Sequence, residues 1–207
     1  MKKTLIFCVC IFAALSLSAC GKVKPSGTCW LTWSQACTGK VDHSDITKVS
    51  KEVLSAFKNK DLQSLATFVG PQGVRFSPYS YVRTGNDVVL LTNAILELTT
   101  TDLKTVRWTQ DGSGLPITMN FRDYISGYVY DVDFLTAPEV LINQKSDRGN
   151  TINNAFDVYA GKYLIEYYFS GFEPKYEGMD WKSLMLVFDK KDGQRYLIGV
   201  IHGQRTI

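Results

Sequence analysis

Histidine and aspartate are the residues of this sequence that could carry acid–base chemistry. The chain of 207 residues has two histidines, His43 and His202. His202 follows the last run of strand-forming residues, and beside a carboxylate such as Asp131 or Asp180 it could act as a general base near neutral pH. The alternative is that His202 ends a strand and its ring meets solvent or a main-chain carbonyl. Two histidines are too few for a metal centre or proton relay built on several of them.

Other motifs offer weaker candidates for a reactive site. Asp131-Val132-Asp133 could give oxygens to calcium, but it lacks the dense alternation of an EF-hand loop and is also expected where a helix ends. The segment Asp111-Gly112-Ser113-Gly114 could hold an anion through main-chain N–H groups, or form a plain turn. No serine stands in a Gly-x-Ser-x-Gly elbow. We therefore predict neither a metal nor a cofactor.

Aromatic residues greatly outnumber the candidate catalytic groups. Tyrosines on a concave sheet give apolar contact with a polar tip, which suits a ligand pocket. The alternative is that they fill the core. Arg75, in the first expected strand, would favour an anionic ligand if its side chain points inward. The candidate pocket residues are Arg75, Tyr79, Tyr124, Tyr128, Asp131, Tyr167, Asp180, Trp181 and His202.

The N-terminus has the layout of a bacterial lipoprotein signal. Lys2 and Lys3 precede an apolar stretch, and Leu17-Ser18-Ala19-Cys20 leads to the cleavage point. In such signals the cysteine is acylated, so Cys20 would anchor the chain in a lipid bilayer. Gly21 is not the aspartate associated with inner-membrane retention. We therefore expect the periplasmic face of the outer membrane in a Gram-negative host, and otherwise the outer face of the cell membrane.

Cleavage before Cys20 also changes the charge and the cysteine count. The formal charge of +3 includes Lys2 and Lys3, so the mature chain is close to neutral and has no broad electrostatic reason to bind nucleic acid. Cys29 and Cys37 are the remaining thiols, and in an oxidising compartment we expect them to form a structural disulfide.

The sequence divides into a signal over residues 1–19, a lipidated tether over 20–40 and a domain over 41–207. Helical spacing of apolar residues predicts a long helix from Ser44 to about residue 57 and a shorter one after Asp61, its expected cap. A short strand follows at 74–76, and residues 87–98 fit neither period. Residues 121–129 are predicted as a helix with an aromatic face, capped by Thr118. Predicted strands cover 140–143, 162–169, 184–188 and 196–201, the last two joined by a hairpin at Lys191-Asp192-Gly193.

Helices followed by consecutive strands predict an α+β domain with helices on one face of an antiparallel sheet. This order resembles the NTF2-like (cystatin-like) fold over about residues 44–202. The resemblance implies a curved sheet wrapped around a long N-terminal helix, with two shorter helices and a cone-shaped cavity. It also implies that His202 lies at the cavity mouth and that a homodimer could form through the open sheet face.

Several short phrases also resemble a family of exported bacterial lipoproteins that has no established activity. These are Phe76-Ser77-Pro78-Tyr79, Asp111-Gly112-Ser113-Gly114-Leu115-Pro116-Ile117, Gly178-Met179-Asp180-Trp181-Lys182-Ser183-Leu184 and Tyr196-Leu197-Ile198-Gly199-Val200-Ile201-His202. The family pattern has an acidic residue after the histidine and a tryptophan near the end. Here Gly203 and Arg205 stand in that region, so this terminus departs from the pattern.

The expected function is that of a membrane-anchored envelope lipoprotein that binds a small ligand or an envelope protein without catalysis. The alternative is a small cavity enzyme, an isomerase, dehydratase or hydrolase, that uses His202 with Asp131 or Asp180. A third hypothesis is an assembly or inhibitor module that has a filled cavity and acts through its surface.

Overall fold

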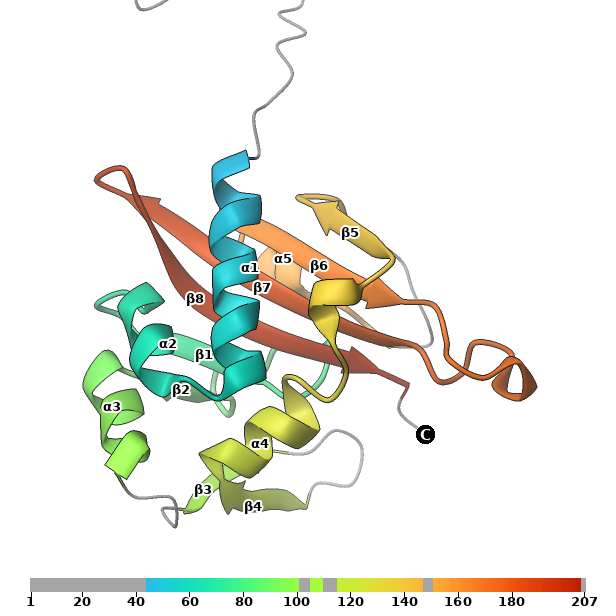
Figure 1. The fold of residues 1–207 in the computed structure, drawn as a ribbon, viewed down its shortest axis with the longest axis horizontal. Coiled ribbons are helices and arrows are strands. Elements are labelled where there is room, and N and C mark those ends of the chain that lie inside the picture. Colours follow the sequence, from blue (N-terminus) through green and yellow to red (C-terminus); the bar gives the residue numbers. More distant parts are fainter. Residues whose placement is uncertain (1–43, 101–104, 110–114, 147–150, 206–207) are drawn as a thin grey trace, which may run out of the picture. The chain divides into compact units, whose positions relative to one another are not determined.

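The computed structural model describes residues 44–100, 105–109, 115–146 and 151–205 (Figure 1). Its helices are α1 (Ser44–Asn59), α2 (Leu62–Phe68), α3 (Thr92–Thr100), α4 (Phe121–Tyr128) and α5 (Ala155–Val158), with short 3-10 turns η1 (Phe134–Thr136) and η2 (Pro174–Tyr176). Its strands are β1 (Val74–Ser77), β2 (Val88–Leu90), β3 (Thr105–Thr109), β4 (Pro116–Asn120), β5 (Glu139–Ile142), β6 (Tyr163–Phe169), β7 (Lys182–Lys191) and β8 (Gln194–Gln204).

Six of these strands form one sheet in the order β2-β1-β8-β7-β6-β5, and β3 and β4 form a separate hairpin. Every neighbouring pair in the large sheet is antiparallel except β1 and β8, which run parallel. The long strands β7 and β8 are joined at Asp192 and Gly193, both with positive φ, as a tight hairpin requires. The predicted hairpin is therefore confirmed.

Helix α1 lies across one face of the curved sheet, which we call the inner face (Figure 1). Alternate residues of β7, Leu184, Leu186 and Phe188, belong to the same buried cluster as Val53 and Phe57 of α1. Alternation along a strand sends every second side chain to the same face, so this cluster is the core between helix and sheet. The α+β class and the long N-terminal helix against a curved sheet are confirmed.

The opposite, outer face of the sheet carries a second, smaller core. Met185 and Val187 of β7 point there and pack with residues of the 78–87 loop and of the segment 155–159, which contains α5; among them are Val82 and Tyr159. Asn154 ties these two segments together, because its side chain accepts from the Val82 N–H at 2.7 Å and donates to the Val82 carbonyl at 3.1 Å. Segments of the chain itself therefore cover part of the face through which a homodimer was expected.

The helix caps confirm one prediction from the sequence and correct another. Asp61 caps α2 as predicted, accepting from the Ser64 N–H at 3.0 Å. The predicted cap of α4 was wrong: Thr118 lies within β4, and Asn120 accepts from the Asp123 N–H at 2.9 Å instead. The stretch that fitted neither period is divided between β2 and α3, which explains its mixed pattern.

Candidate functional site

The end of β8 brings His202 to Asp131, one of its two predicted partners. Nε2 of His202 lies 3.2 Å from Oδ1 of Asp131. The other carboxylate oxygen accepts from Nζ of Lys182, which also donates to Oε1 of Gln204 at 3.2 Å. The sheet register explains the grouping, since Lys182 pairs with Gln204 and the next inward residue of β7 pairs with His202. We call these four residues the Asp131 network.

Burial of Asp131 is offset by its two hydrogen-bond partners, His202 and Lys182. Burial alone would raise the pKa of Asp131, but the hydrogen bonds and charges of His202 and Lys182 outweigh it and hold the pKa below its usual value. The Asp131 side chain is 11% exposed and that of Lys182 is 25% exposed. The carboxylate is therefore ionised at neutral pH and fixed between its partners.

His202 itself is completely buried, with an exposed fraction of 0%. Its Nδ1 has no hydrogen-bond partner among the described residues, and its Nε2 faces Asp131. A general base must come within hydrogen-bond reach of the proton that it removes. A ring enclosed on all sides offers no such approach, so the expected place of His202 at a cavity mouth was wrong, and the geometry suits a structural contact.

Aromatic side chains fill the inner face where the resemblance implied a cavity. Trp108 of β3 and Tyr124 of α4 are stacked with ring centroids 3.5 Å apart and planes 11° apart. Phe76 of β1 meets both rings edge-on, and Phe121 stacks on them. All four rings are at most 2% exposed. Among the described residues, this part of the inner face is a packed aromatic core.

Four of the predicted pocket tyrosines take part in this packing or border it. Burial raises the pKa of Tyr124 well above its usual value, and its hydroxyl has no partner among the described residues. Tyr128 stacks on Tyr124 and meets Tyr79 edge-on. Tyr167 of β6 shares a hydrogen bond of 2.6 Å with Ser50 of α1. These tyrosines therefore hold elements together, as the filled-core alternative predicted.

Three predicted pocket residues lie away from the inner face. Arg75 points outward and donates to the main-chain carbonyls of Thr84 and Asp87, at 2.9 and 3.2 Å. Trp181 packs beside Gly203 on the outer face, where an added Cβ would come within 3.1 Å of its ring. Asp180 organises the loop between β6 and β7. The structure therefore does not bring Arg75, Trp181 or Asp180 to His202.

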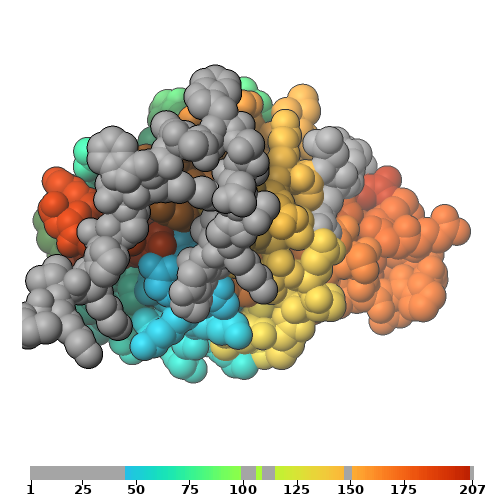
Figure 2. Space-filling model, turned by 90° about the horizontal axis from the view of Figure 1, so that it is seen from above, coloured from blue at the N-terminus to red at the C-terminus, as the bar shows by residue number. Residues whose placement is uncertain are grey.

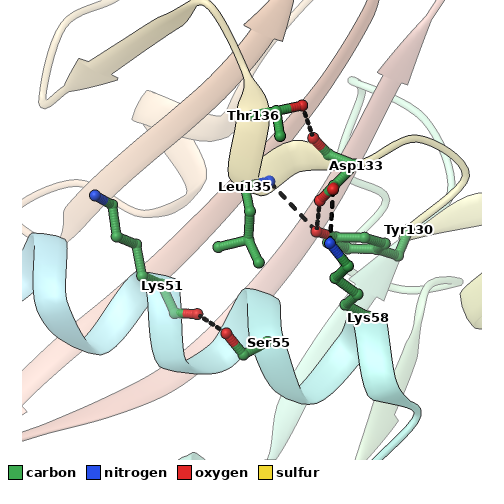
Figure 3. A network of polar contacts seen from close by, with 7 residues as sticks. All are labelled: Lys51, Ser55, Lys58, Tyr130, Asp133, Leu135 and Thr136. Atoms are coloured by element: carbon green, nitrogen blue, oxygen red, sulfur yellow. Dashed lines mark hydrogen bonds and ion pairs between the residues drawn. The ribbon is translucent and has the colours of Figure 1, made fainter.

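Asp133 also has its own partners and does not join Asp131 in a cation site. Its carboxylate accepts from Nζ of Lys58 and from the hydroxyl of Tyr130, each at 2.6 Å (Figure 3). This contact fastens the end of α1 to the segment before η1. No group of three or more His, Cys, Asp or Glu residues that could hold a metal occurs within the described ranges.

An open groove with a volume of about 550 Å³ lies between α1 and α2. Ala56 and Phe68 supply its apolar lining, while Lys51, Glu52 and Asp61 bring both signs of charge. Mixed charge of this kind selects no class of ligand.

In the part of the chain that the structure describes, no helix is long and apolar enough to cross a membrane.

Several residues of the site, Gln204 of the Asp131 network among them, were not singled out from the sequence. Lys182 stood inside a quoted phrase but was not recognised as a partner, because its contact with Asp131 spans 51 positions. Trp108 lies in β3, a strand that was not predicted. The predictions of acylation at Cys20, of a disulfide between Cys29 and Cys37 and of a turn at 111–114 fall outside the described residues.

Comparison with known proteins finds solved structures of low sequence identity. No family model matches the sequence, and no curated protein matches it. A solved protein designated Rd1NTF2_05 aligns over 78% of this chain and 100% of its own, at 14% identity and a TM-score of 0.35. A protein from Xanthomonas campestris, designated a calcium/calmodulin dependent protein kinase II association domain, aligns over 83% of this chain and 93% of its own, at 9% identity and a TM-score of 0.36. Neither likeness is close enough to transfer a ligand, a partner or a reaction.

Proposed function

We propose that this chain is a lipid-anchored envelope protein that binds a protein partner through its surface and catalyses no reaction. The observation that carries the proposal is the packed aromatic core on the inner face. Trp108, Tyr124, Phe76 and Phe121 are buried and pack against one another on the inner face, where the fold resemblance had implied a cavity. A domain without that pocket retains its surface as the means of recognition.

The lipid anchor supports the same proposal from the sequence. Cys20 after Leu17-Ser18-Ala19 would be acylated, and several acyl chains on one residue bind a membrane firmly, at about 0.8 kcal/mol per buried methylene. A protein held at a membrane meets its partners there at a raised effective concentration. A binding module gains from that placement without needing a reactive site.

A second candidate function is a small acid–base enzyme, and one observation favours it. His202 and Asp131 form the histidine–carboxylate pair that such chemistry uses, with Nε2 and Oδ1 3.2 Å apart. Burial of the ring argues against it, because a substrate would have to displace packed side chains to reach Nδ1. We therefore rank it below surface binding.

The two candidates are separated by one experiment on the full-length protein in its host. A photoreactive residue is placed at exposed positions around the domain, such as Leu91, Ile152 and Tyr176. Surface binding predicts a protein crosslinked from one region of the surface, unaffected by His202→Ala in a variant that is still folded. No protein crosslink from any position, together with His202-dependent conversion of a component of the host's small-molecule extract, would establish the enzyme instead.

A further inference from the structure

We infer that the loop joining β6 and β7, residues 170–181, is the docking element, and that its partner is a protein with an apolar cleft rimmed by lysine and arginine. This inference rests on the proposed function and names the surface and the partner chemistry. The loop projects from the body of the domain beyond the ends of β6 and β7 (Figures 1 and 2). We call it the β6–β7 loop.

Large apolar side chains are concentrated on this loop. Phe172, Tyr176 and Met179 are 47%, 44% and 46% exposed. They are three of the nine large apolar residues exposed in the described ranges, and they lie within eight consecutive positions. Aromatic residues and methionine are enriched in protein interfaces, whereas single exposed apolar residues are ordinary. Their gathering on one projection marks a contact surface.

Hydrogen bonds fix the shape of the loop before any partner binds. Oδ2 of Asp180 accepts from the main-chain N–H groups of Phe172 and Glu173, at 3.0 and 2.9 Å. The N–H of Met179 donates to the Tyr176 carbonyl at 2.8 Å, closing the turn that follows η2. A binding loop that is already ordered loses less conformational entropy on association.

Two glycines allow the two sides of the loop to cross closely at its base. A Cβ on Gly171 would lie 3.0 Å from Cα of Gly178, and Gly178 has a φ of +77°. Phe172 stacks on Phe169 of β6, with ring centroids 5.2 Å apart. The exposed side chains are therefore carried on a rigid base and not on a free tether.

Charge on the loop indicates the chemistry of the partner. Glu173, Glu177 and Asp180 bring three carboxylates, against Lys175 as the one lysine of the loop. Nζ of Lys175 lies 3.8 Å from a carboxylate oxygen of Glu173 and 4.8 Å from the centre of the Tyr176 ring, so these two charges offset each other and the carboxylates of Glu177 and Asp180 leave the loop acidic. An acidic loop is repelled by anionic lipid headgroups, which disfavours a membrane surface as its target. It complements a basic rim around an apolar cleft.

The test begins with crosslinking in cells and ends with purified proteins. A photoreactive residue replaces Tyr176 in the full-length anchored chain, and Ile152, which is 75% exposed and lies outside the loop, provides the control position. The protein crosslinked from position 176 is identified, purified and titrated against variants of the lipoprotein. Unchanged melting temperatures and circular dichroism spectra show that each variant is folded.

We expect Tyr176→Ala and Met179→Ala to weaken binding at least tenfold, and Ile152→Ser to leave it unchanged. Asp180→Ala should weaken binding several-fold although its carboxylate lies at the base of the loop, because the exposed side chains then lose their fixed positions. Binding should also weaken as salt rises. Rescue by Asp180→Asn, whose side-chain oxygen can still accept from the two N–H groups, would identify the effect as positioning.

Other outcomes overturn the inference in distinguishable ways. A protein crosslinked from Ile152 and not from Tyr176 would leave the proposed function standing and refute this surface. Crosslinks from position 176 only to lipid, or only to a second copy of this chain, would refute the stated partner. No protein crosslink from any exposed position would refute the proposed function as well.

Discussion

Removing the Asp131 carboxylate should destabilise the fold more than any other change of a single charged group in the Asp131 network. In the variant Asp131→Ala, Nε2 of His202 loses its acceptor while Nδ1 already has none among the described residues. Of its partners among the described residues, Nζ of Lys182 then keeps Gln204. The His202 ring would then be fully buried with neither nitrogen hydrogen-bonded.

The magnitude follows from the burial of the three groups. A buried polar group left without a partner costs about 1–3 kcal/mol, and breaking a buried ion pair costs about 3–5 kcal/mol. The side chain of Lys182 is 25% exposed, so water can replace part of what it loses, whereas His202 is 0% exposed. We therefore expect a loss of about 2–3 kcal/mol in the free energy of unfolding. For a domain of this size that corresponds to a melting temperature lower by roughly 4–12 °C.

Urea and thermal unfolding, followed by circular dichroism, measure this loss at pH 7. The matched control is Asp133→Ala, two positions along the chain, whose side chain is 39% exposed and whose partner Lys58 is 46% exposed. Surface ion pairs contribute little, so the control should lose far less stability. Replacing His202 and Asp131 together with apolar residues should recover part of the loss. An Asp131→Ala variant as stable as the wild type would refute a structural role for the network.

Three further predictions concern two tyrosine hydroxyls, the space around two glycines and the pKa of Asp131. Tyr124→Phe removes a buried hydroxyl without a described partner and should be neutral or stabilising, whereas Tyr167→Phe breaks a hydrogen bond of 2.6 Å and should cost about 1 kcal/mol. Gly203→Ala should cost about 1–3 kcal/mol, because its Cβ would overlap the Ser183 hydroxyl and approach the Trp181 ring within 3.1 Å. Gly127→Ala, with open space around it in α4, should stabilise the protein by about 0.5–1 kcal/mol. The pKa of Asp131 is lower in the folded protein than in the unfolded chain. The stability that this carboxylate contributes is therefore complete above about pH 4, near the usual aspartate pKa of 3.8, and is lost as the pH falls through the folded pKa.

Each of these is checked by unfolding measurements on paired variants. If Tyr124→Phe costs as much as Tyr167→Phe, the Tyr124 hydroxyl has a partner and the inner face holds a polar site. Equal effects of alanine at Gly203 and Gly127 would contradict the close packing on the outer face. The stability difference between wild type and Asp131→Asn should shrink as pH falls below 4; a difference that stayed constant to pH 2 would show that the Asp131 pKa is not depressed.

Local sequence signals predicted some of the elements but not how the site is assembled. Asp61 and the Asp192-Gly193 turn act within a few residues, so their roles could be inferred from the sequence. The cap of α4 was misplaced because Thr118 belongs to β4, a strand defined by its pairing with β3. The β3 strand also supplies Trp108, the ring that closes the inner face, and no periodic pattern had indicated it.

The Asp131 network shows the same limit. His202 and Asp131 are 71 positions apart, and the sequence offered Asp131 and Asp180 as equal partners. The sheet register and the segment after α4 decide between them, because both are products of long-range packing. Burial of His202 likewise depends on which face of β8 is inward, which strand alternation leaves open. A histidine at a strand end was therefore identified as a candidate without its environment.

Native mass spectrometry of the protein, gently extracted from host membranes, would show whether the domain carries a bound small molecule or a protein partner. We expect a polypeptide that begins at Cys20, carries its acyl groups and holds no further small molecule, with a protein partner in the bound fraction. A small molecule that stays bound and is released by substitution of Tyr124 or His202 would contradict it, because the inner face would then be a pocket and not a packed core.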